Sequence, residues 1–233
     1  MECKILCNCY IIDGKGVIAV DKDFLLESYG ECYGPEAGPW NLSLTNKYLE
    51  YMITKFFEEN FVIQEKAKVC NIGIGAGYWD RYLSYKLNGG SLTSIDIDEE
   101  CCRQLRECLE NEKNTNPVEI IQSDVTLIDY KDCCFDIITM IGSTRIESGL
   151  YEQIIVKAFD MLKAGGSLYY QTLDRNETKE DFEQVCFENN VSVEIYWVDE
   201  EYGYRAQYWK VVKNNERQFF RATRGCKNSN QTW

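Results

Sequence analysis

The chain has 233 residues, of which 45% are hydrophobic, and its formal net charge is −13. This apolar content can fill the core of one large domain, whereas the negative charge argues against nucleic acid and anionic membranes as partners. No run of about 18 apolar residues predicts a membrane span, and the polar start of the chain does not resemble a signal peptide, so we expect a cytoplasmic protein.

The first 60 residues predict a hairpin, a loop and a helix. Residues 5–20 alternate as two short strands around Asp13 and Gly14, which is a hairpin signal. Residues 28–40 are rich in Gly and Pro and predict a loop. Residues 44–60 predict a helix, with Thr45 as its N-cap and an apolar face that includes Leu49 and Phe56.

From Lys68 onward, apolar runs typical of buried strands alternate with helical patterns. The expected strands are 68–73, 91–96, 118–123, 135–141 and 166–172, and the expected helices are 78–87, 98–113, 147–163 and 179–189. Continuous apolar strands separated by helices predict a parallel sheet that is covered on both faces. Two glycine pairs, 89–90 and 165–166, are expected at helix exits.

The last part of the chain predicts antiparallel strands at 192–198, at 205–212 and, more weakly, at 218–223, because the connections are short. The sequence therefore predicts an α/β fold with a doubly wound, mostly parallel, seven-stranded sheet. Its expected parts are a hairpin, loop and helix at 1–60 that form a lid over the substrate, a main domain at 61–225, and a tail at 226–233.

Two residue types narrow the chemistry, because the chain has 12 cysteines and no histidine. No CxxC pair occurs, so we predict no metal site and expect the cysteines to pack as small apolar side chains. The segment "CKILCNC" near the start leaves a soft-metal site open as an alternative. Without histidine, catalysis must use carboxylates, tyrosines, lysines or thiols, or need no base.

The segment "VCNIGIGAGYWDRYL" carries the clearest functional signal. Gly73, Gly75 and Gly77 follow the first parallel strand and open the next helix. Ligands of such sheets bind at the carboxyl ends of the strands, and glycine lets a ligand approach the backbone and the helix N-terminus. The spacing is GxGxG, so the dinucleotide pattern GxGxxG is not matched. A tight turn without a ligand is the alternative explanation.

Two carboxylates strengthen the ligand interpretation. Asp96 ends the second strand, where a carboxylate can accept hydrogen bonds from both hydroxyls of a ribose. Asp124 follows the third strand, where it can accept from an adenine amino group. Asp98 competes with Asp96 for the ribose, although its position before a helix makes it a good N-cap. Together these acids favour an adenosyl ligand without phosphates.

The motifs "VCNIGIGAG", "TSIDIDEE", "IIQSDV", "FDIITMIG" and "MLKAGGSLYY" resemble, in this order, those of class I S-adenosylmethionine-dependent methyltransferases. The resemblance covers roughly residues 68–172. It implies S-adenosylmethionine as cofactor and S-adenosylhomocysteine as product, bound by Asn71, Gly73, Ile74, Gly75, Gly77, Asp96, Ile97, Asp124, Val125 and Ile141. At the position of Asn71 the family usually has an acid, so this chain keeps an acceptor there but loses the charge.

A narrower resemblance links "SLTNKYLEYMI", "GIGAGYWDRYLSYKL" and "TSIDID" to protein L-isoaspartyl O-methyltransferases and to their relatives that modify ribosomally made peptides. It places Ser43 and Thr45 at the positions of the family's threonine and functional serine. Tyr48 matches the family's tyrosine, and Tyr78 matches its aromatic residue after the glycines. Lys47 replaces a proline, and the end of the chain departs from the pattern. The resemblance implies methylation of a carboxylate, which is already ionised at neutral pH and needs no base.

The acceptor residues follow from this hypothesis. Arg145 can hold a carboxylate bidentately, and Thr45 can donate to the attacking group; both are assigned catalytic roles. Trp40, Ser43 and Tyr78 are assigned to substrate binding, with the loop around Trp40 closing over the site. A solvated loop arginine and ordinary aromatic packing remain alternatives. A small-molecule N- or O-methyltransferase and a non-catalytic cofactor-binding partner protein also remain open.

Overall fold

The computed structural model describes residues 9–12, 17–20, 44–112, 116–130, 134–142, 151–201 and 205–214. The first two of these ranges form a two-stranded antiparallel sheet of β1 (Cys9–Ile12) and β2 (Val17–Val20). The predicted hairpin is thus confirmed. The loop at 28–40, the expected strand at 218–223 and the tail lie outside the described residues.

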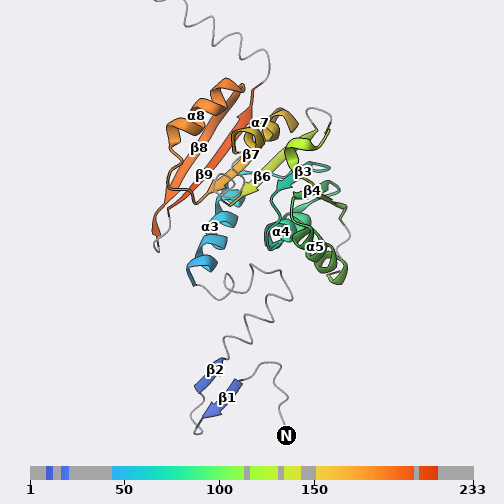
Figure 1. The fold of residues 1–233 in the computed structure, drawn as a ribbon, viewed down its shortest axis with the longest axis vertical. Coiled ribbons are helices and arrows are strands. Elements are labelled where there is room, and N and C mark those ends of the chain that lie inside the picture. The colour runs from blue at the N-terminus through green and yellow to red at the C-terminus, as the bar shows by residue number, and fades with distance from the viewer. Residues whose placement is uncertain are drawn as a thin grey trace, which may run out of the picture.

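The main sheet has seven strands in the order β5-β4-β3-β6-β7-β9-β8 (Figure 1). Strands β3 to β7 are parallel, and β9 is antiparallel to both of its neighbours, β7 and β8. The strand order reverses between β3 and β6, which is where ligands of doubly wound sheets bind. The bounds are β3 (Lys68–Ile72), β4 (Ser91–Asp96), β5 (Val118–Gln122), β6 (Phe135–Ile141), β7 (Leu162–Thr172), β8 (Val191–Asp199) and β9 (Ala206–Lys213).

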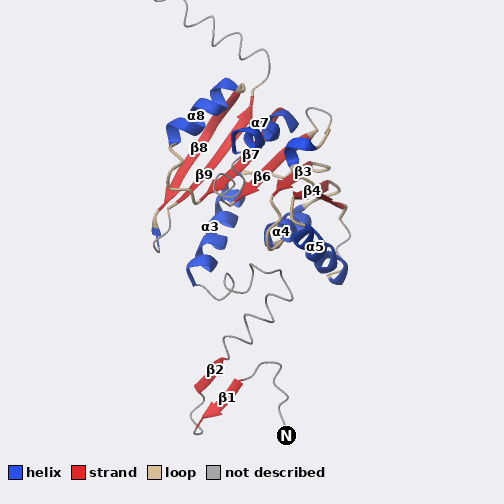
Figure 2. Ribbon diagram, viewed as in Figure 1, coloured by secondary structure: helices blue, strands red, loops and turns tan. Residues whose placement is uncertain are grey.

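Helices cover both faces of this sheet, as Figure 2 shows. One face carries α3 (Leu44–Asn60), α4 (Tyr78–Lys86) and α5 (Glu99–Asn111), and the other carries α7 (Tyr151–Met161) and α8 (Lys179–Glu188). A short 3-10 helix, η1 (Val125–Leu127), follows β5. The predicted seven-stranded α/β fold is confirmed. The central strands are mostly apolar because both of their faces are covered, although Asn71, Ser94 and Thr139 are buried polar residues within them.

The core on the α3 face is rich in aromatic side chains. Phe56 of α3 stacks on Tyr169 of β7 at 5.3 Å between ring centroids and packs against Tyr208 of β9 at 5.5 Å. Phe57 meets Trp79 of α4 edge-on at 5.2 Å. Helix α3 therefore packs against the sheet along its apolar face. That the segment 1–60 forms a lid over the substrate stays a prediction.

Two expectations about element ends were wrong. Helix α3 begins at Leu44, so Thr45 lies inside the first turn and is not the N-cap. Helix α7 ends at Met161 and β7 begins at the next residue, so Gly165 and Gly166 lie inside β7 and not at a helix exit. A Cβ on Gly166 would come within 2.9 Å of the carbonyl oxygen of Lys163, and the pairing of β6 with β7 shifts register here. These glycines thus permit an irregularity at the start of the strand.

Four of the cysteines, Cys70, Cys101, Cys102 and Cys186, are buried in the cores and form no disulfide, as expected for small apolar side chains. In the described ranges, no group of three or more cysteines and carboxylates is arranged to hold a metal ion. None of the helices described is both long and apolar enough to cross a membrane.

Candidate active site

The glycine corner joins β3 to α4 at the carboxyl edge of the sheet. Gly73, Gly75 and Gly77 have φ angles of +89°, +51° and +72°, which side chains rarely adopt. A Cβ on Gly73 or Gly75 would meet no atom within 4 Å, whereas one on Gly77 would meet Cδ1 of Leu105 at 3.2 Å. The first two glycines therefore leave open backbone for a ligand, and the third lets α4 approach α5.

Asp96 holds the glycine corner in place. Its Oδ2 atom accepts from the backbone N–H groups of Ile74 at 2.6 Å and Gly75 at 3.2 Å, and its Oδ1 atom accepts from the N–H of Asp98 at 2.9 Å. A carboxylate has about four acceptor sites, so Asp96 can still accept from a ligand hydroxyl while it fixes the loop. Asp98 caps α5 by accepting from the N–H of Glu100 at 2.7 Å, which confirms the helix-cap interpretation of that residue.

The next strand end supplies a second acid and apolar surface. Oδ1 of Asp124 accepts from the backbone N–H and the hydroxyl of Thr126, both at 2.8 Å, and so starts η1. Ile97, directly after Asp96, is 73% exposed, and Val125 is buried. An exposed aliphatic side chain beside two strand-end acids fits a flat aromatic ring such as adenine.

Asn71 is turned into the interior and is fully engaged there. Its Nδ2 atom donates to both carboxylate oxygens of Asp80 at 3.0 Å and to the carbonyl oxygen of Gly73 at 2.8 Å. Its Oδ1 atom accepts from the hydroxyl of Thr139 at 2.7 Å. The side chain thus holds the backbone of the glycine corner through the carbonyl oxygen of Gly73. Its contact with the cofactor stays a prediction.

Asp80 supplies an acid next to the position where the family's acid is missing. It lies on α4, is 0% exposed, and burial raises its pKa to about 7, an effect that the hydrogen bond from Asn71 only partly offsets. We did not predict this residue from the sequence. The signal was present, because Asp80, Leu83 and Ser84 have the spacing of one inward helix face.

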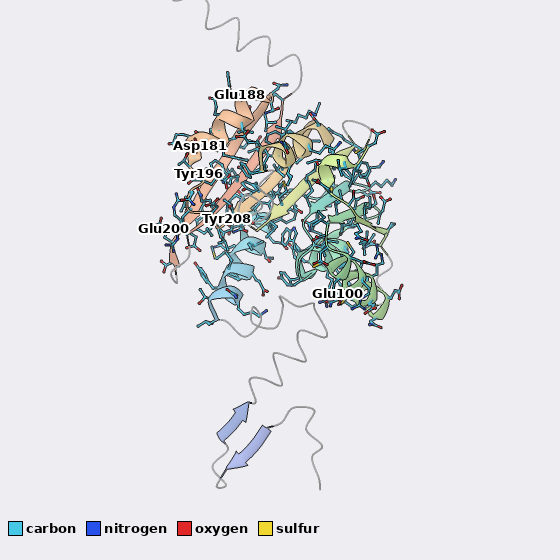
Figure 3. All side chains as sticks on the ribbon, viewed as in Figure 1. Glu100, Asp181, Glu188, Tyr196, Glu200 and Tyr208 are labelled. Carbon is cyan, nitrogen blue, oxygen red and sulfur yellow. The ribbon has the colours of Figure 1, made fainter. Side chains whose placement is uncertain are left out.

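A row of residues continues from the glycine corner across the sheet. Ile141 of β6 pairs with Gln171 of β7, which pairs with Tyr208 of β9, which pairs with Trp197 of β8. All four face α3, and Figure 3 shows Tyr208 on β9 near α3. The backbone N–H of Gly142 donates to Oε1 of Gln171 at 3.0 Å. Sequence reasoning identified Ile141 but missed the other three.

The acceptor residues predicted from the sequence are only partly described. Tyr78 is 43% exposed, and its hydroxyl lies 3.4 Å from that of Thr54 on α3. Thr45 is half-buried in the first turn of α3. Trp40, Ser43 and Arg145 lie outside the described residues, so their roles stay predictions.

Comparison with known proteins identifies the class of the domain. Residues 69–166, which run from β3 into β7, match the family described as a methyltransferase domain. The chain carries a methyltransferase domain. The matched segment includes the glycine corner, Asp96 and Asp124. Of the row of four residues across the sheet, it includes only Ile141.

Solved structures share the fold of this methyltransferase. A putative sarcosine dimethylglycine methyltransferase from Galdieria sulphuraria has a TM-score of 0.64 at 12% identity, covering 82% of this chain and 99% of its own. An S-adenosylmethionine-dependent methyltransferase from Aquifex aeolicus has a TM-score of 0.56 at 21% identity, with coverages of 69% and 89%. The [4+2]-cyclase SpnF has a TM-score of 0.60 at 12% identity, with coverages of 70% and 80%.

The class I S-adenosylmethionine-dependent methyltransferase resemblance is therefore confirmed, whereas the narrower resemblance to protein L-isoaspartyl O-methyltransferases is not supported. S-adenosylmethionine is the cofactor of this enzyme and S-adenosylhomocysteine is its product. The residues present fit this group, because Gly73 and Gly75 leave open backbone beside the carboxylate of Asp96.

Proposed function

We propose that the chain is an O-methyltransferase that methylates a carboxylate of a peptide, either on a side chain or at the C-terminus. The observation that carries the proposal is the nature of the polar groups at the carboxyl edge on the α3 face. Gln171 offers an amide, and burial raises the pKa of Tyr208, so its phenol stays protonated at neutral pH. Such groups donate hydrogen bonds and are poor general bases, which suits a nucleophile that is already ionised.

The residues of the glycine corner would hold the cofactor. The open backbone at Gly73 and Gly75 would face it, Asp96 would accept from its ribose hydroxyls, and Asp124 and Ile97 would contact its adenine. When bound, the cofactor supplies a methyl group on a positively charged sulfur. The task left to the protein is to align the acceptor oxygen with that methyl and to exclude water.

Arg145 is the proposed clamp for the substrate carboxylate. A guanidinium can bind a carboxylate bidentately, and a protein of net charge −13 needs such local compensation. Thr45 would donate to the attacking group, while Ser43, Trp40 and Tyr78 would line the acceptor site. Arg145→Ala should raise the KM of the acceptor and leave the affinity for S-adenosylhomocysteine unchanged.

A small-molecule N- or O-methyltransferase is the second candidate. One structural neighbour is named as a putative sarcosine dimethylglycine methyltransferase, so the fold also accommodates a small amino acid acceptor in that protein. A non-catalytic cofactor-binding partner protein is a third candidate, because Asn71 stands where the family usually has an acid. An amine acceptor would require a base, and Asp or Glu would have to supply it.

The test is methyl transfer from isotope-labelled S-adenosylmethionine to matched acceptors, followed by mass spectrometry. The panel holds peptides with a free C-terminus, the same peptides amidated, an isoaspartyl peptide, and polyamines. A labelled product that mild base hydrolyses would be an ester and would support the proposal. A base-stable product on the amines would favour the second candidate, and binding of S-adenosylhomocysteine without any product would favour the third.

A further inference from the structure

Two buried polar side-chain atoms on neighbouring strands lack a hydrogen-bond partner among the described residues. Gln171 is 1% exposed and Tyr208 is 0% exposed. In the part of the chain that the structure describes, neither Nε2 of Gln171 nor Oη of Tyr208 has a partner. Native proteins leave few buried donors unsatisfied, so each such group needs a physical reason, of which an absent ligand is one.

The position of the pair favours the methyl acceptor as that ligand. Gln171 and Tyr208 are directly paired across β7 and β9, so their side chains are neighbours on the α3 face. Gln171 is also paired with Ile141 of β6. Because strands lie about 4.8 Å apart, Gln171 is two strand spacings, or about 10 Å, from β3 and its glycine corner. The pair lies on the side of that corner away from Asp96.

The chemistry of the pair determines what it can bind. The bond from the N–H of Gly142 to Oε1 of Gln171 fixes the amide orientation, so the unpaired end is the N–H donor. Burial is the largest cause that raises the pKa of Tyr208, and the nearby Asp199 raises it further, so its hydroxyl keeps its proton. Two neutral donors side by side match an oxygen that only accepts hydrogen bonds. An ammonium group would leave the amide N–H unpaired.

An aromatic surface adjoins the two donors. The ring of Trp197 lies 4.9 Å from that of Tyr208 and 6.5 Å from that of Phe56, and Trp197 is 37% exposed. This partly exposed indole forms an apolar edge that solvent can reach beside a polar interior. A ligand that combines an apolar part with a terminal carbonyl or carboxyl oxygen fits this combination.

We propose that Gln171 and Tyr208 form a subsite that binds a carboxyl or carbonyl oxygen of the methyl acceptor, with Trp197 as its apolar wall. The subsite rests on the proposed function, because it identifies the ligand as the group that is methylated or as one next to it. Trp209 provides a contrast, since its Nε1 atom is also buried without a partner but lies in the core on the opposite face, against Phe182.

The test uses the full chain loaded with S-adenosylhomocysteine and three fragment probes that share one ring. Phenylacetate carries a carboxylate, phenylacetamide a carbonyl oxygen, and phenethylamine an ammonium group. The side-chain amide signal of Gln171, assigned by its loss in Gln171→Met, is followed by ¹⁵N NMR during each titration. We expect the signal to shift with phenylacetate, phenylacetamide or both, and not with phenethylamine; the relative affinities tell carboxylate from carbonyl.

The variants provide the second readout. Tyr208→Phe should weaken the oxygen probe about tenfold, as removal of one hydrogen bond to a ligand predicts, whereas Trp209→Phe should leave its affinity unchanged. The subsite is overturned if no oxygen probe shifts the signal, if phenethylamine binds as well, or if Tyr208→Phe binds like the wild type. If Tyr208→Phe does not fold, Gln171→Met takes its place, with affinities measured from ligand signals.

These outcomes are separable from those of the proposed function. Fragment binding does not require turnover, so a positive titration with no ester product would support the subsite and reject carboxylate methylation. Conversely, an ester product whose KM is unchanged in Gln171→Met and Tyr208→Phe would keep the proposed function and reject the subsite.

Discussion

Replacing Asp80 by Asn should remove a pH dependence of stability that this one carboxyl creates. Burial raises its pKa from 3.8 to about 7 in the folded chain, and the nearby Asp96 adds to this. Unfolding returns Asp80 to water and to its ordinary pKa. Between about pH 4 and pH 7 the folded chain therefore holds a proton that the unfolded chain has released, so stability must fall as pH rises through this window.

The size of this effect follows from the two pKa values. They differ by about 3 pH units, and each unit corresponds to about 1.4 kcal/mol, so the full loss is about 4 kcal/mol. About half of this loss falls between pH 5 and pH 7, where about 2 kcal/mol of unfolding free energy should disappear in the wild type. Asn at this position keeps an oxygen that can accept from Nδ2 of Asn71 and does not titrate.

The assay is urea unfolding of the wild type and of Asp80→Asn at pH 5, 6, 7 and 8. The other carboxylates titrate in both proteins, so the difference between the two free energies isolates Asp80. Asp98→Asn is the matched control, because it changes an acid on an exposed helix cap. A difference between wild type and Asp80→Asn that stays constant across this pH range would refute the assignment of a buried, proton-holding carboxyl.

Three further predictions concern the glycine corner and the core. Asp96→Ala should weaken binding of S-adenosylhomocysteine by roughly 1.5–3 kcal/mol in calorimetry, whereas Asp98→Ala should instead lower stability by about 1 kcal/mol through the lost helix cap; equal affinities would move the ribose role away from Asp96. Gly73→Ala should reduce cofactor affinity with only about 1 kcal/mol of destabilisation from its positive φ, while Gly77→Ala should mainly lower the Tm, because its Cβ would crowd Leu105; the reverse pattern would contradict the roles given to these glycines. Phe57→Ala should destabilise the fold by about 3–5 kcal/mol in urea unfolding, and a change below 1 kcal/mol would show that α3 is not part of the core.

Strands β3 to β6 could be predicted from the sequence, because most of them are buried on both faces and they are bounded by glycines and helical patterns. Each strand from β3 to β6 begins within one residue of its expected position. The start of β7 was not predictable, since "LKAGG" gives no apolar alternation and its irregular pairing depends on β6. The place of β9 between β7 and β8 also depends on contacts between strands that are distant in sequence.

The residues on the cofactor side of the site were easier to predict from the sequence than those on the acceptor side. A glycine corner and strand-end acids are local signals, because one turn of the chain requires them. The bonds of Asn71 to Asp80 and Thr139 join three separate elements, and the pairing of Gln171 with Tyr208 joins two. In the sequence, Gln171 appears only as one more residue of "SLYYQT", and nothing beside it indicates an unpaired amide.

The insertion of β9 between β7 and β8 has a consequence for how the enzyme is completed during synthesis. Tyr208 lies on β9, the last strand in the part of the chain that the structure describes, yet β9 is inserted between β7 and β8. A nascent chain that stops before Ala206 would present β7 with an unpaired edge, which is prone to pair with other chains. The glycine corner can form early, whereas the pairing of Gln171 with Tyr208 can form only after β9 has been synthesised.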